Sequence, residues 1–133
     1  MSFERKTFLL TAIAFVCLVV FYSVALAKQL FFYYWWYDIL LHFLGGLTVS
    51  LAALCFYLYS GYFKIPLHTE NQIFYTALAA ALIVGILWEF FEYFTGLAFV
   101  IGSYSLDTAK DLSLDTFGAI VTYIYFMRHF HEL

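Results

Sequence analysis

Seven side chains that can bind protons or metal ions are grouped at helical spacing in three segments of the sequence. They are Asp38 and His42, then Glu89 and Glu92, then Asp107, Asp111 and Asp115. Residues three or four apart share one face of a helix, so each segment would present its group on one side. Carboxylate oxygens with an imidazole suit Mg²⁺, Mn²⁺, Ca²⁺, Zn²⁺ or Fe²⁺. The same groups can also exchange protons with a substrate.

The composition indicates that these residues belong to a membrane protein. Of 133 residues, 65% are hydrophobic and 11% are charged, and the mean hydropathy is +0.90. A soluble domain carries about 25% charged residues, so this chain has too little polar surface for an ordinary soluble enzyme. A net charge of −3 with six basic residues excludes a nucleic-acid binder. We therefore predict one all-α integral membrane domain over residues 1–133.

Four stretches are apolar over about the 20 residues that a membrane-spanning helix needs. Their predicted bounds are about 8–27, 37–59, 73–101 and 110–128. In the fourth stretch only Thr116–Met127 is free of charge, and these twelve residues at about 1.5 Å each would be too short to cross. The helix must therefore include Asp111 and Asp115, which places both carboxylates below the membrane surface. We predict a four-transmembrane-helix bundle.

The first stretch has a second interpretation. Arg5 and Lys6 precede it, and Ala25-Leu26-Ala27 could serve as the cleavage site of a signal peptide. The apolar run is longer than the about 7–15 residues of a signal peptide, which favours a membrane span.

The basic residues predict the orientation of the bundle. With four spans, one side of the membrane holds four basic residues and the other holds two: Arg5, Lys6, Lys64 and Arg128 against Lys28 and Lys110. Cytoplasmic loops carry the excess of Lys and Arg, so both termini are expected in the cytoplasm of a multi-pass protein of the cell (inner) membrane. All seven titratable side chains would then meet in the outer half of the bilayer.

Small residues continue each acidic face along its helix. They mark the contact surfaces of helices in membranes, so the carboxylates are expected to point into the bundle. The residues in question are Gly45, Val49 and Ala52 beyond His42, Gly85, Ala81 and Ala77 before Glu89, and Gly118 and Thr122 beyond Asp115.

The charges in this predicted cluster do not balance. An unpaired Asp at the centre of a span costs about 2.5–3.5 kcal/mol. Lys110 and a protonated His42 can offset two of the six carboxylates, which leaves four negative charges. Protons, water or two divalent cations could offset the rest. The predicted metal ligands are His42, Glu89, Glu92, Asp107, Asp111 and Asp115.

His42 and Asp38 form the predicted catalytic pair, with His42 as a metal ligand or a general base. Structural alternatives remain open at this point. Asp38 and Asp107 could be helix caps, and Glu89 and Glu92 could be structural partners of neighbouring hydroxyl groups or of Trp88.

The motifs resemble those of a known family. The resemblance rests on Asp38-x-x-x-His42, the pair Glu89 and Glu92, and Asp111-x-x-x-Asp115-x-x-Gly118. This arrangement resembles the VanZ-like membrane proteins over about residues 36–125, and it is similar to small inner-membrane proteins of the YjdF type. The resemblance implies a helical membrane fold in the cell envelope, where VanZ is associated with glycopeptide-antibiotic resistance. VanZ-like chains tend to carry Gln in place of Glu92 and an Arg before the aspartates, so no substrate is carried over.

Two classes of function fit these residues. The first is a hydrolase or transferase that acts on a lipid or lipid-linked envelope substrate, using divalent ions or, without metal, two carboxylates that share a proton. The second is a small transporter or accessory protein whose acids bind or relay cations or protons, which with four helices would require an oligomer. A third possibility is a structural metal that only holds the helices of the bundle together. The expected partners are membrane lipids.

Overall fold

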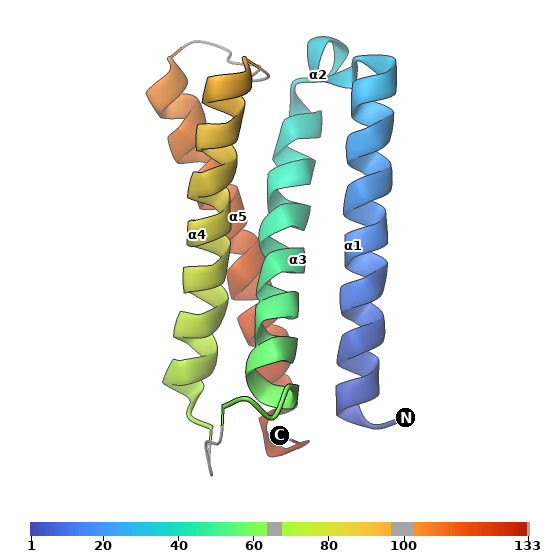
Figure 1. Ribbon diagram of the computed structural model, residues 1–133, viewed down its shortest axis with the longest axis vertical. Helices are drawn as coiled ribbons and strands as arrows, with labels where there is room; N and C mark the ends of the chain where they lie inside the picture. The colour runs from blue at the N-terminus through green and yellow to red at the C-terminus, as the bar shows by residue number, and fades with distance from the viewer. Residues whose placement is uncertain (64–67, 97–102, 133) are drawn as a thin grey trace.

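The described part of the chain folds into four long helices that run side by side (Figure 1). The computed structural model describes residues 1–63, 68–96 and 103–132. Within these ranges the elements are α-helical or 3-10 helical, with no strand, which confirms the all-α class. The helices are α1 (Phe3–Lys28), α2 (Leu30–Tyr33), α3 (Trp36–Tyr59), α4 (Glu70–Thr95) and α5 (Tyr104–Arg128), followed by a short 3-10 helix (Phe130–Glu132).

Three of the long helices have the length and composition of membrane spans. Helices α1, α3 and α4 each contain an apolar stretch long enough to cross a bilayer. Helix α5 has 25 residues, and at about 1.5 Å per residue it also reaches about 37 Å, but its first half carries the charged residues. Crossing of the membrane by α5 therefore stays a prediction, together with the cytoplasmic location of the termini. Both termini do lie at the same end of the bundle (Figure 1).

Local sequence sets the ends of α4. The helix begins with a capping box, in which the Thr69 hydroxyl accepts from the Gln72 amide and the Gln72 side chain accepts from the Thr69 amide. It ends at Thr95 because Gly96 adopts a left-handed backbone with φ 69°. The helix is thus shorter than the predicted span, which ran to residue 101. The last part of that span, residues 97–101, lies outside the described residues.

Glycines bring α3 and α5 into close backbone contact. A Cβ atom on Gly118 would meet the backbone of Phe43 and Leu47, and one on Gly46 would meet the backbone of Asp115. The small-residue prediction is confirmed for α4 and α5, where all the named residues are buried. On α3 the predicted contact residue is wrong by one position, because Gly46 and not Gly45 is buried. Gly46 makes the contact, whereas Ala52 is exposed.

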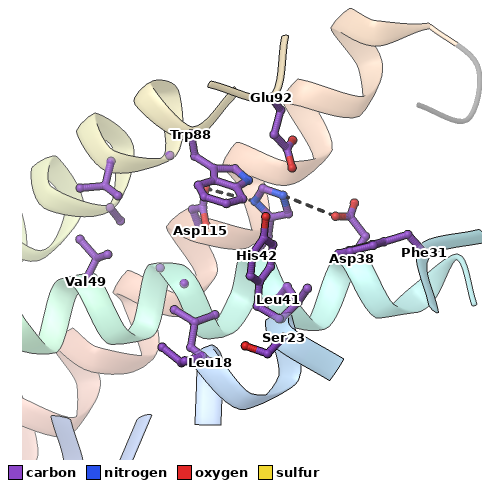
Figure 2. A pocket seen from close by; sticks show the side chains of 17 residues that line it. Leu18, Ser23, Phe31, Asp38, Leu41, His42, Val49, Trp88, Glu92 and Asp115 are labelled. Atoms are coloured by element: carbon purple, nitrogen blue, oxygen red, sulfur yellow. Dashed lines mark ion pairs between the residues drawn. The ribbon is translucent and has the colours of Figure 1, made fainter. Parts of the chain in front are cut away.

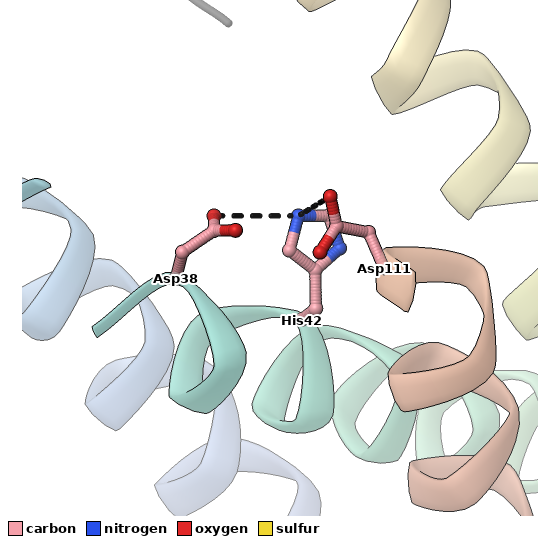
Figure 3. A group of neighbouring side chains, drawn as sticks. All are labelled: Asp38, His42 and Asp111. Carbon is pink, nitrogen blue, oxygen red and sulfur yellow. Dashed lines mark ion pairs between the residues drawn. The ribbon is translucent and has the colours of Figure 1, made fainter. Parts of the chain in front are cut away.

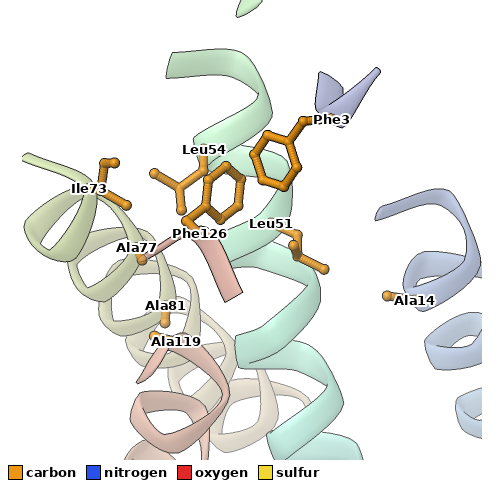
Figure 4. Close-up of a cluster of buried hydrophobic side chains, with 9 residues drawn as sticks. All are labelled: Phe3, Ala14, Leu51, Leu54, Ile73, Ala77, Ala81, Ala119 and Phe126. Carbon is orange, nitrogen blue, oxygen red and sulfur yellow. The ribbon is translucent and has the colours of Figure 1, made fainter. Parts of the chain in front are cut away.

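An apolar core fills the half of the bundle near the termini (Figure 4). Its buried side chains come from all four long helices: Phe3, Ala14, Leu51, Leu54, Ile73, Ala77, Ala81, Ala119 and Phe126. A smaller cluster around Tyr37 joins α1 to α3 near the other end, where the Tyr37 hydroxyl donates to the Phe21 carbonyl at 3.1 Å. The acidic residues and His42 lie in the same half of the bundle.

Candidate functional site

The three acidic segments meet at the end of the bundle away from the termini. Asp38 lies in the first turn of α3, with His42 one turn further on. Glu89 and Glu92 lie in the last two turns of α4, which runs in the opposite direction, and the three aspartates belong to the first half of α5. The predicted convergence at one depth is therefore present in the structure. Which compartment this end faces stays a prediction.

His42 lies at the centre of the cluster and is only 6% exposed. Its Nε2 atom is 3.6 Å from Asp38 Oδ1 and 3.9 Å from Asp111 Oδ2 (Figure 3), and its Nδ1 atom is 3.6 Å from Asp115 Oδ2 (Figure 2). Hydrogen bonds between such groups measure about 2.7–3.2 Å. The three carboxylates therefore face the imidazole from two sides without a direct hydrogen bond to it.

Lys110 neutralises part of the cluster at its more exposed edge. Its Nζ atom is 2.8 Å from Asp107 Oδ1, 3.1 Å from Asp38 Oδ2 and 3.2 Å from Asp111 Oδ1. Neither Asp38 nor Asp107 is a helix cap, because Trp35 and Ser103 occupy those positions. Both aspartates instead accept hydrogen bonds from Lys110. The contact with Asp38 joins α5 to α3.

Glu89 has a partner on α5 that the sequence analysis did not identify. The Thr108 hydroxyl donates to Glu89 Oε2 at 2.6 Å, and the Tyr104 hydroxyl donates to the Glu89 carbonyl at 2.9 Å. A neighbouring hydroxyl was the structural alternative for this residue, and one of its two oxygens does have that role. Thr108 lies three residues before Asp111, so helix periodicity places it on the same face of α5 as that acidic residue.

Three carboxylate oxygens at the site are buried without a hydrogen-bond partner. They are Glu89 Oε1, Asp111 Oδ1 and Asp115 Oδ2, and their residues are 7%, 2% and 5% exposed. Asp111 Oδ1 is within ion-pair distance of Lys110 but has no hydrogen bond. An unsatisfied buried group costs about 1–3 kcal/mol, and more when it is charged. The site therefore has unused capacity to accept a proton or a cation.

The residues form two overlapping groups with the geometry of metal ligands. One consists of Asp38, His42 and Asp111, and the other of His42, Glu89 and Glu92. In each group the possible ligand atoms lie within 4.8 Å of one another. Oxygen atoms with one imidazole nitrogen suit hard or borderline divalent ions. The other two predicted ligands, Asp107 and Asp115, belong to neither group. Asp107 forms an ion pair with Lys110. Asp115 lies at the Nδ1 atom of the imidazole, on the side opposite to Asp38 and Asp111.

Gly85 on α4 leaves the space that the Asp115 carboxylate occupies. A Cβ atom at this position would meet Asp115 Oδ2 and the Leu112 side chain. At Gly45, by contrast, a Cβ atom would lie at an ordinary distance of 3.7 Å from Asp115 Oδ1. The glycine on α4 thus allows α5 to bring its carboxylate between α3 and α4, next to His42.

A cavity of about 280 Å³ adjoins the cluster (Figure 2). Asp38, His42, Glu92 and Asp115 form part of its wall. The remaining wall is mostly apolar and includes residues of α1, α3 and α4, among them Leu18, Leu41, Val49 and Trp88. The sequence analysis did not predict this cavity, because it depends on how α1 packs against the other helices.

Comparison with known proteins places the chain among membrane proteins. A family model described as "Predicted membrane protein (DUF2238)" matches residues 1–132. Neither the curated proteins nor the solved structures contain a match.

Proposed function

Because this chain belongs to the predicted membrane protein family DUF2238, we propose that it works within the bilayer as a divalent-metal-dependent hydrolase or transferase. The proposed substrate is a lipid or a lipid-linked molecule of the cell envelope. In this proposal the four long helices cross the cell (inner) membrane with both termini in the cytoplasm. The resemblance of the motifs to VanZ-like and YjdF-type proteins supports the envelope setting.

The observation that carries the proposal is the buried set of oxygens without hydrogen bonds around His42. One of these oxygens belongs to Asp115, which forms part of the largely apolar cavity wall, and another belongs to Asp111, which faces the other side of the imidazole. A site built only for stability would pair such oxygens with donors, as Thr108 pairs with one oxygen of Glu89. Free acceptors beside an apolar cavity instead suit a cation and a hydrophobic substrate.

Each residue has a distinct role in this proposal. Asp111, Glu89 and Glu92 would hold the ions together with His42, and the ions supply Lewis-acid polarisation of a phosphoryl or acyl oxygen. Asp38 faces the same Nε2 atom as Asp111 and belongs to the same ligand group, whereas Asp115 faces the Nδ1 atom at 3.6 Å and would orient the ring. Lys110 holds both Asp38 and Asp111 in place. If His42 does not bind an ion, it would instead be the general base that accepts a proton from the attacking water or hydroxyl group.

Metal analysis of the purified protein tests the first part of the proposal. We expect a stoichiometric divalent metal in the wild type and its loss in Asp111→Asn and Glu89→Gln. The matched control is Glu70→Gln, which makes the same change in the exposed first turn of α4, and it should retain the metal. A wild-type protein without metal after purification in metal-supplemented buffer would refute the metal site.

Lipid turnover in proteoliposomes tests the second part. We expect wild-type protein to convert a phospholipid or a lipid-linked phosphate into a product detectable by mass spectrometry, and Glu89→Gln to abolish the conversion. Turnover that persists in a chelator would favour the metal-free carboxylate pair instead. Metal binding without any turnover would indicate that the metal only stabilises the helix bundle.

Transport has less support in the geometry. Between the acidic cluster and the ends of the helices near the termini, the described bundle is filled by the apolar core of Figure 4. No Asp, Glu or His lies within residues 43–59 of α3 or 116–127 of α5. A single chain therefore offers no series of such groups for a relay. Cation flux in liposomes that Glu89→Gln abolishes would reverse this conclusion.

A further inference from the structure

The cavity beside the acidic cluster is elongated along the helices. On α3 its lining residues run from Asp38 to Val49, and on α4 from Glu92 to Ala81. At about 1.5 Å per residue, eleven residues of α3 correspond to a length of about 16 Å. The cavity therefore extends from the acidic end of the bundle towards its middle.

The two ends of this cavity differ in polarity. Asp38, His42 and Glu92 line the end near the start of α3, whereas Val49 and Ala81 line the other end. A lipid in one leaflet has the same order, with a polar headgroup at the surface and hydrocarbon towards the midplane. The polarity of the cavity thus matches that of a lipid lying parallel to the helices.

The cavity can be reached from the side of the bundle. Val19 on α1 and Val84 on α4 both line it, yet they are 45% and 43% exposed. Between these helices the rings of Tyr22 and Trp88 are in contact, with centroids 5.4 Å apart. In a membrane, the space between α1 and α4 would face acyl chains directly.

We propose that this cavity binds one hydrocarbon chain of a membrane phospholipid, which enters between α1 and α4 and places its headgroup beside Asp38, His42 and Glu92. The volume of about 280 Å³ is close to the lower limit of about 300–1,000 Å³ for small-molecule sites. It suits one chain, so the second chain stays in the bilayer. The inference rests on the proposed function, because the acidic cluster alone would repel a phosphate and needs a cation to bind it.

Photocrosslinking in lipid nanodiscs tests this proposal. The probe is a phosphatidylethanolamine with a diazirine near the end of one acyl chain, and labelled peptides are mapped by mass spectrometry. We expect labelling to concentrate on α1 and α4 around Leu18 and Val84. In Val84→Trp, which fills the cavity, labelling there should fall about tenfold.

Two further variants make the result specific. Ile83→Trp places the same ring on the adjacent, 60% exposed position outside the cavity and should label like the wild type. Leu18→Trp fills the cavity from α1 and should reproduce the effect of Val84→Trp even if the latter folds poorly. Uniform labelling of the exposed apolar surface, unchanged by both cavity-filling variants, would overturn the proposal.

The outcomes also separate this inference from the proposed function. Specific labelling in a protein that holds the metal but converts no lipid would support the chain site and refute the catalytic proposal. Lipid turnover that is unchanged in both Leu18→Trp and Val84→Trp would refute the chain site and leave the catalytic proposal in place.

Discussion

Asp115 Oδ2 lies 3.6 Å from the Nδ1 atom of His42 and has no hydrogen-bond partner, although Asp115 is only 5% exposed. The carboxylate comes from α5 and the imidazole from α3, and Gly85 of α4 leaves the space that the carboxylate occupies. Three helices thus create one buried acceptor beside an imidazole.

Replacing Gly46 should separate α3 from α5. In Gly46→Ala the new methyl group would meet the backbone of Asp115, and such overpacking costs about 1–3 kcal/mol. In the matched variant Gly45→Ala the nearest atom would be 3.7 Å away, so the higher helix propensity of Ala should leave stability unchanged or raise it slightly. Unfolding in mixed detergent micelles measures both. Equal stability of the two variants would contradict the close contact.

Gly85→Ala should affect the site more than the fold. Its methyl group would meet the flexible Leu112 side chain and the Asp115 carboxylate, which must then move away from His42. We expect metal content to fall while helix content measured by circular dichroism is retained. Full metal content in Gly85→Ala would show that Asp115 does not need its present position.

Removal of the Lys110 charge should destabilise the protein. Lys110→Met leaves Asp38, Asp107 and Asp111 without their cation. Exposed ion pairs are worth about 0–1 kcal/mol, whereas loss of one partner of a buried pair costs about 3–5 kcal/mol. Because the Lys110 side chain is 39% exposed, we expect an intermediate loss of about 1–3 kcal/mol.

Two additional variants check this prediction. Lys28→Met removes an exposed basic residue from the last turn of α1 and should have little effect on stability. Adding Asp107→Asn to Lys110→Met removes one of the unpaired carboxylates and should restore part of the loss. Additive losses in the double variant would contradict the ion-pair network.

The hydroxyl group of Thr108 should be required to position Glu89. Thr108→Val is close in shape but removes the donor at 2.6 Å from Glu89 Oε2, so a loss of about 1–3 kcal/mol is expected. Thr108→Ser retains the hydroxyl and should recover most of that stability. Comparable stabilities of Thr108→Val and Thr108→Ser in an unfolding titration would show that this hydrogen bond contributes little.

A bound cation should raise the thermal stability of the purified protein. Binding to the folded state adds about 2.7 kcal/mol when the free ion is at 100 times its Kd. We therefore expect EDTA to lower the melting temperature and Mn²⁺ to restore it. Asp111→Asn should show a smaller shift or none, because Asp111 belongs to one of the two ligand groups. A melting temperature unaffected by EDTA and Mn²⁺ in the wild type would contradict the metal site.

The amino-acid sequence by itself determined the class of protein and the end of the bundle at which the polar groups meet. Apolar length predicts spans that correspond to α1, α3 and α4, and the spacing of Asp38 and His42 places both on one helix face. Because consecutive spans run in opposite directions, the acids of three segments had to meet at one end. These conclusions need only helix periodicity and chain direction, which are local properties.

The tertiary structure decided which of these groups touch. Lys110 bridges three aspartates, Thr108 pairs with Glu89, and Gly46 rather than Gly45 makes the contact with α5. The cavity between α1 and α4 is a further result of packing. Periodicity gives the face of a helix but not its rotation or its axial position against a neighbour. Those two quantities depend on how side chains of different helices fit together, and a shift of one residue is enough to change every partner.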